Sequence, residues 1–102
     1  MAIVQVSIVP IGTSKSSISK YVAQAIRALE KEREIAYQLT PMGTIIEGNL
    51  DKVLSLIRQM HESGFDNEIQ RVVTTMIIDD RRDKTATMAS KVKSVQDKLH
   101  AG

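Results

Sequence analysis

The chain has no cysteine and no tryptophan, and only 3% of its 102 residues are aromatic. Without cysteine there is no disulfide framework, no zinc site made of thiolates and no cysteine nucleophile. Domains that bind single-stranded RNA on a sheet stack the bases on aromatic side chains. The three aromatic residues here are Tyr21, which is predicted in a helix, Tyr37, and Phe65, which is predicted in a turn. We therefore expect no nucleic-acid partner.

Long apolar runs and a strong excess of one charge are also missing. No segment approaches the roughly 20 apolar residues that cross a bilayer, and the first residues lack the pattern of a signal peptide. The formal net charge is +2, which is too small to indicate a polyanionic partner. A chain of 102 residues fits one hydrophobic core. We expect a single domain spanning residues 1–102, in the cytoplasm and without membrane contact.

What the chain does contain is an alternation of β-rich and helical patterns. Strands are predicted at residues 3–11, 35–39, 44–47 and 69–78, and helices at about 18–31, 50–63 and 88–99. The order β-α-β-β-α-β is that of a ferredoxin-like α+β domain with an antiparallel sheet, here with an additional C-terminal helix. Because the fourth strand is as apolar as the first, we expect the two to lie side by side in the middle of the sheet. The charged run 79–84 is predicted to be a loop.

The first strand carries apolar side chains on both faces, with Val4, Val6 and Ile8 on one side and Ile3 and Val9 on the other. Two helices cover only one face of a four-stranded sheet. We expect the C-terminal helix to cover part of the second face and a partner subunit to cover the rest. The sequence therefore predicts a homo-oligomer, either a dimer or a tetramer.

Complete enzyme motifs are not found. The turn at residues 12–17 is rich in hydroxyls and precedes a helix, so its backbone N–H groups can hold an anion, although ordinary helix capping is the favoured interpretation. His61 and His100 have no spacing typical of a metal site, and both are predicted at the surface. We predict no catalytic residue and no metal ligand.

One carboxylate is harder to explain. Glu47 follows Ile45 and Ile46 on a predicted strand, where partial burial requires a partner. Arg71 at the start of the fourth strand is one candidate partner, which makes the pair structural. A bound ligand is the other candidate, and the sequence leaves both interpretations open.

Three stretches then resemble a known family. They are Pro10-Ile11-Gly12-Thr13 with the serines that follow, Tyr37-Gln38-Leu39-Thr40-Pro41-Met42-Gly43-Thr44-Ile45-Ile46-Glu47-Gly48, and Arg71-Val72 leading to Ile78-Asp79-Asp80-Arg81. Together they are similar to the small thiamine-binding proteins. The resemblance implies a ferredoxin-like domain that assembles into dimers or tetramers. It also implies binding of thiamine or its hydroxymethylpyrimidine part as a ligand, without a reaction and without a cofactor.

By motif and chemistry, the predicted ligand-binding residues are Thr13, Ser16, Ser17, Tyr37, Thr40, Met42, Gly43, Thr44, Glu47 and Arg71. Glu47 is expected to balance the charge of the cationic thiazolium or to form a hydrogen bond with the edge of the pyrimidine. The hydroxyl groups are expected to orient the ligand, and Met42 and Tyr37 are expected to contact its rings. The main alternative is a regulatory or structural homo-oligomer with no small-molecule role. An enzyme is a weaker third hypothesis.

Overall fold

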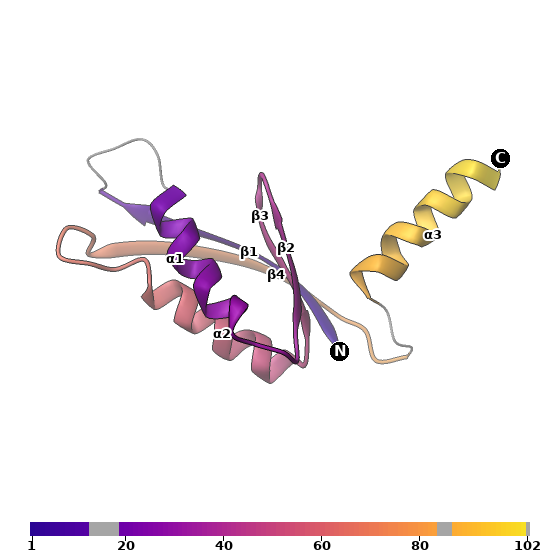
Figure 1. The fold of residues 1–102 in the computed structure, drawn as a ribbon, viewed down its shortest axis with the longest axis horizontal. Coiled ribbons are helices and arrows are strands. Elements are labelled where there is room, and N and C mark those ends of the chain that lie inside the picture. The colour runs from indigo at the N-terminus through magenta and orange to yellow at the C-terminus, as the bar shows by residue number, and fades with distance from the viewer. Residues whose placement is uncertain (13–18, 84–86, 102) are drawn as a thin grey trace.

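The computed structural model describes residues 1–12, 19–83 and 87–101, which form seven elements (Figure 1). In chain order these are β1 (Ala2–Ile11), α1 (Ser19–Glu30), β2 (Ala36–Thr40), β3 (Gly43–Gly48), α2 (Leu50–Glu62), β4 (Arg71–Asp80) and α3 (Met88–Ala101). The predicted ferredoxin-like α+β fold with a C-terminal helix is confirmed. Among these helices, none has the length and apolar character needed to span a bilayer.

The four strands form one antiparallel sheet in the order β2-β3-β1-β4. Val4 of β1 lies opposite Ile46 of β3 on one side and Ile78 of β4 on the other. β4 therefore neighbours β1 as expected, but the prediction that it lies in the middle of the sheet is wrong. β1 and β3 are the central strands, and β4 is an edge strand. The prediction that residues 79 and 80 begin a loop is also wrong, because they extend β4 to Asp80.

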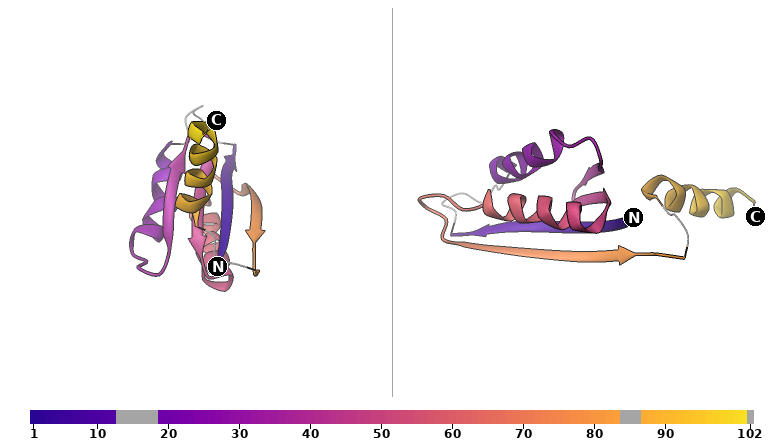
Figure 2. Two further views of the ribbon diagram at one scale, coloured as in Figure 1. Left: turned by 90° about the vertical axis from the view of Figure 1, so that its right-hand side faces the viewer. Right: turned by 90° about the horizontal axis from the view of Figure 1, so that it is seen from below.

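Even-numbered residues of β1 face the two helices and build the core. Val4 and Val6 are buried there with Ile46 of β3, against Leu29 of α1 and Leu56 of α2. Burial of each such side chain contributes about 1.5–3 kcal/mol to folding. Figure 2 shows α1 and α2 on the same side of the sheet. The other face, which we call the open face, carries the odd-numbered residues of β1, β3 and β4 and the even-numbered residues of β2.

The second helix begins as the sequence predicts. The side chain of Asn49 accepts hydrogen bonds from the backbone N–H groups of Asp51, at 3.0 Å, and Lys52, at 3.4 Å. These bonds satisfy two of the donors that a helix start leaves without an intrahelical partner. The cap fixes the start of α2 directly after β3.

The C-terminal helix departs from the expectation. α3 has no buried residue, and it extends away from the body beyond the end of the sheet that carries the N-terminus (Figures 1 and 2). The prediction that it covers part of its own sheet is therefore wrong. No described element of the chain covers the open face.

Candidate functional site

A cavity of about 150 Å³ opens between the first turns of α1 and the β2–β3 hairpin, against β1 and α2. Its lining comes from five elements and the turn of the hairpin: Val6, Ser7, Ile8, Tyr21, Val22, Ala25, Leu39, Thr40, Pro41, Met42, Gly43, Thr44 and Met60. The cavity lies on the helix-covered side of the sheet. Segments far apart in sequence thus build one site.

Gly43 allows the hairpin to approach β1 closely. A Cβ on this residue would lie 2.7 Å from the carbonyl oxygen of Val6, and its φ of 153° is one that side chains rarely adopt. Any other residue would push the hairpin away from β1. The cavity wall therefore depends on this glycine.

Thr40 holds the turn of the hairpin in shape. Its hydroxyl donates a hydrogen bond of 2.7 Å to the carbonyl of Gly43 and accepts one of 3.3 Å from the backbone N–H of Met42. Both bonds are local, so the hydroxyl is engaged in the turn. Thr40 shapes the site through the backbone of its neighbours.

Tyr21 is positioned from outside the cavity. Its hydroxyl donates a 3.1 Å hydrogen bond to Asp66, and Asp66 also accepts 2.8 Å bonds from the backbone N–H groups of Glu68 and Ile69. The hydrogen bonds from these two backbone N–H groups are the main reason that the pKa of Asp66 lies below 3.8. Desolvation is the largest effect that raises the pKa of Tyr21 above 10.0, and the hydrogen bond to the Asp66 carboxylate is the next largest. The tyrosine therefore stays neutral and its ring stays at the cavity wall.

The chemistry of the lining is apolar with a few hydroxyls. Among the described residues that line the cavity, none has a charged side chain. In the described part of the chain, no three acidic or histidine side chains gather as metal ligands. A cavity near 150 Å³ holds one six-membered aromatic ring. The site therefore suits a single neutral ring with a few hydrogen-bonding groups.

A second hollow, of about 360 Å³, lies at the start of α2. Three of the polar side chains that line it have partners within the chain. Arg82 pairs with Asp80 at 3.0 Å, and Asn49 caps the helix. We therefore take the first cavity as the candidate site.

The structure brings together four of the ten residues predicted from sequence: Thr40, Met42, Gly43 and Thr44 all line the cavity. Tyr37 lies on β2 opposite Ile46, outside the lining. Thr13, Ser16 and Ser17, with the hydroxyl-rich turn, lie outside the described residues.

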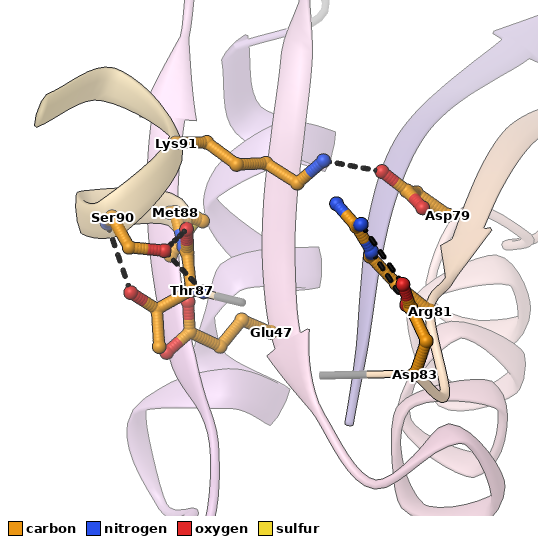
Figure 3. A network of polar contacts seen from close by, with 8 residues as sticks. All are labelled: Glu47, Asp79, Arg81, Asp83, Thr87, Met88, Ser90 and Lys91. Atoms are coloured by element: carbon orange, nitrogen blue, oxygen red, sulfur yellow. Dashed lines mark hydrogen bonds and ion pairs between the residues drawn. The ribbon is translucent and has the colours of Figure 1, made fainter. Parts of the chain in front are cut away.

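Glu47 has a partner within the chain that the sequence did not predict. Its Oε2 accepts a 2.7 Å hydrogen bond from the backbone N–H of Met88, the first residue of α3 (Figure 3). Nearby, Lys91 of α3 pairs with Asp79 of β4 at 2.6 Å. A carboxylate at a helix N-terminus is stabilised by the helix dipole. Glu47 thus anchors α3 to the open face of the sheet.

Arg71 is not the partner of Glu47. Along β1, Glu47 lies opposite Ile3 and Arg71 lies opposite Ile11. Eight residues of extended strand separate these positions by roughly 26 Å. The proposed structural pair between the two is therefore wrong, and Arg71 is not among the described residues that line the cavity.

Sequence reasoning missed the contribution of the helices to the site. Tyr21, Val22 and Ala25 of α1, and Met60 of α2, line the cavity but belong to ordinary apolar helix stripes. Tyr21 was the one of these residues that the sequence could have indicated, because a tyrosine beside the apolar stripe of a helix places a hydroxyl at the edge of the core. Nothing local in the sequence shows that the hairpin reaches this turn of α1.

Residues 4–96 match the family described as thiamine-binding protein. The chain is 48% identical over 102 residues to the UPF0045 protein YqgV of Bacillus subtilis, covering 97% of this chain and 98% of that one. It is 44% identical over 105 residues to a UPF0045 protein of Staphylococcus xylosus, covering 100% and 98%.

Solved structures share the fold. The crystal structure of the protein MJ1052 from Methanocaldococcus jannaschii superposes with a TM-score of 0.84 at 35% identity, over 94% of this chain and 96% of that one. A Thermotoga maritima protein provisionally assigned to thiamine biosynthesis or salvage superposes with a TM-score of 0.73 over 92% and 97%. At 18% identity, this second likeness shows the fold alone.

The anchoring role of Glu47 predicts a local effect. In Glu47→Ala, the backbone N–H of Met88 loses its acceptor, and the start of α3 should be destabilised by about 0.5–2 kcal/mol. Hydrogen exchange should become faster for the amides of Met88 and Ala89, with little change in the core strands. Glu34→Ala, at an exposed position, is the control. Equal exchange in both variants would contradict the role.

The lowered pKa of Asp66 predicts a pH-dependent contribution to stability. A folded-state pKa below the ordinary 3.8 stabilises the fold above that pH, and the effect is lost as the pH falls through the lower folded value. The melting temperature of Asp66→Ala should therefore lie below that of the parent at pH 7, and the gap should narrow toward pH 3. Asp97→Ala, on exposed α3, serves as the control. A gap that is constant with pH would count against this assignment.

Proposed function

Because the chain belongs to the thiamine-binding protein family, we propose that it binds thiamine through the aminopyrimidine ring, in the cavity between α1 and the β2–β3 hairpin. One observation carries the proposal most directly. No described lining residue is charged, the cavity has the volume of one ring, and six of its lining residues belong to the stretch from Tyr37 to Gly48 that resembles the family. Thiamine is here a ligand and not a cofactor.

The size and charge of the cavity select one half of the molecule. Thiamine joins a neutral aminopyrimidine to a permanently cationic thiazolium. A cavity of about 150 Å³ accommodates the first ring alone. Burying the cationic ring without a charged partner would be costly. The thiazolium therefore stays at the mouth, beside exposed Met42, and the hydroxymethylpyrimidine alone is a sufficient ligand.

The lining offers matched contacts for such a ring. The ring of Tyr21 and the sulfur of Met60 provide apolar and polarisable contact, and the hydroxyl of nearly buried Thr44 can bond a ring nitrogen or the exocyclic amine. These contacts require no proton transfer and no nucleophile. We propose binding without catalysis, in the cytoplasm, by a homo-oligomer.

Filling the cavity should remove binding. Val22 lines it from α1, so a phenyl ring in Val22→Phe would occupy the space of the ligand ring. We expect the affinity for hydroxymethylpyrimidine, measured by isothermal titration calorimetry, to fall at least tenfold, which is about 1.4 kcal/mol. The isolated thiazole half should give no binding heat with the parent protein.

Ala23→Phe is the matched control, because Ala23 is the exposed neighbour of Val22 on the same helix and does not line the cavity. It should bind like the parent. Equal affinities for the two variants, both folded, would refute the location of the site. Ligand that is chemically changed after incubation with the protein would refute the non-catalytic role.

A further inference from the structure

The hydroxyl groups of the cavity differ in whether the chain already uses them. Four of the described lining residues carry a hydroxyl: Ser7, Tyr21, Thr40 and Thr44. Tyr21 donates its proton to Asp66, and Thr40 forms two bonds within its own turn, at 2.7 Å and 3.3 Å. The hydroxyls of Ser7 and Thr44 have no hydrogen-bond partner among the described residues. These two are therefore the hydroxyls that a bound molecule can engage.

Thr44 is the more enclosed of the two. Its side chain is 5% exposed, whereas Ser7 is half-buried. On β3 it lies opposite Val6 of β1 and Leu39 of β2, which are both apolar. As far as the described residues go, every wholly enclosed side-chain oxygen or nitrogen has a hydrogen-bond partner. The Thr44 hydroxyl has none among them, so it keeps a small accessible surface, and the space that Thr44 borders is the cavity.

A hydroxyl in such apolar surroundings discriminates between ligands. Displacing water from it without offering a new hydrogen bond costs free energy. A hydroxyl can donate to a ring nitrogen or accept from an amino group on the ring. A carbocyclic ring of the same size offers neither group and leaves the hydroxyl of Thr44 without a partner.

We propose that Thr44 determines the specificity of the cavity and restricts the ligand to single-ring nitrogen heterocycles. This inference rests on the proposed function and specifies the class of ligand. The apolar wall contacts any ring of this size, whereas the bond to Thr44 forms only with a ring that carries nitrogen at its edge. Ser7 contributes less, because a half-buried hydroxyl exchanges its bonds with water at little cost.

The test compares two rings of equal size by isothermal titration calorimetry. Hydroxymethylpyrimidine carries two ring nitrogens and an amino group, and para-methylbenzyl alcohol has the same outline without them. The parent protein should bind the pyrimidine about tenfold more tightly, or better. Thr44→Val keeps the branched side chain and removes the hydroxyl. In this variant the affinity for the pyrimidine should fall about tenfold while that for the alcohol stays or rises, so the preference disappears.

Three further variants serve as controls. Thr75→Val is the same substitution at an exposed position of β4 outside the cavity lining, and it should keep the preference of the parent. Ser7→Ala removes the other free hydroxyl and should also keep it. Thr44→Ser retains the hydroxyl without the methyl group, so it should restore most of the preference that Thr44→Val loses. A general disturbance of the cavity would instead weaken both ligands alike.

The outcomes separate this inference from the proposed function. If neither ring binds the folded parent, both are overturned. If the pyrimidine binds the parent and Thr44→Val keeps the preference, the inference alone is wrong. It is equally wrong if the preference is lost in Ser7→Ala, or if Thr44→Val weakens both ligands to the same degree. Should Thr44→Val not fold, Thr44→Ser decides, because a preference lost despite the retained hydroxyl would contradict the role of that group.

Discussion

The close approach of Gly43 to the carbonyl of Val6 fixes much of what this domain presents to its surroundings. A Cβ at this position would meet that oxygen at 2.7 Å, so the start of β3 is held against β1 as only glycine permits. The register that follows sends Thr44 into the helix-covered face and Glu47 onto the open face. One backbone contact therefore positions both the wall of the cavity and the anchor of α3. A slip of one residue would exchange these two roles.

The two faces of the sheet serve separate purposes. On the helix-covered face, the hairpin and α1 leave space for one neutral ring beside Tyr21, whose hydroxyl is held by Asp66. On the open face, Glu47 and Asp79 hold α3 in a direction in which it cannot cover its own sheet. We propose that the first face binds thiamine and that the second forms the assembly. The separation explains why Glu47, although part of the motif that resembles the family, lies outside the cavity.

Much of the fold was predictable from sequence because each element has a clear period. The alternation in β1 and the stripes of α1 and α2 gave element types and bounds within a few residues. The order of the strands was less accessible, since an apolar pattern does not distinguish a central strand from an edge strand that a partner covers, and β4 was misplaced for this reason. The turn residues Thr40 to Thr44 were found because their chemistry is local. The contributions of Tyr21 and Met60, and the distance between Glu47 and Arg71, depend on register and helix packing, which no local pattern reveals.

The methionines give the most direct test of the central proposal, that the cavity binds the pyrimidine ring. Met42 and Met60 line the cavity, whereas Met1, Met76 and Met88 do not. With ¹³C-labelled methionine methyl groups, a titration with hydroxymethylpyrimidine should shift the NMR signals of Met42 and Met60 and leave those of Met76 and Met88 in place. Shifts at Met76 or Met88 alone would locate the ligand on another surface. Unchanged signals throughout, at millimolar ligand, would contradict the proposal.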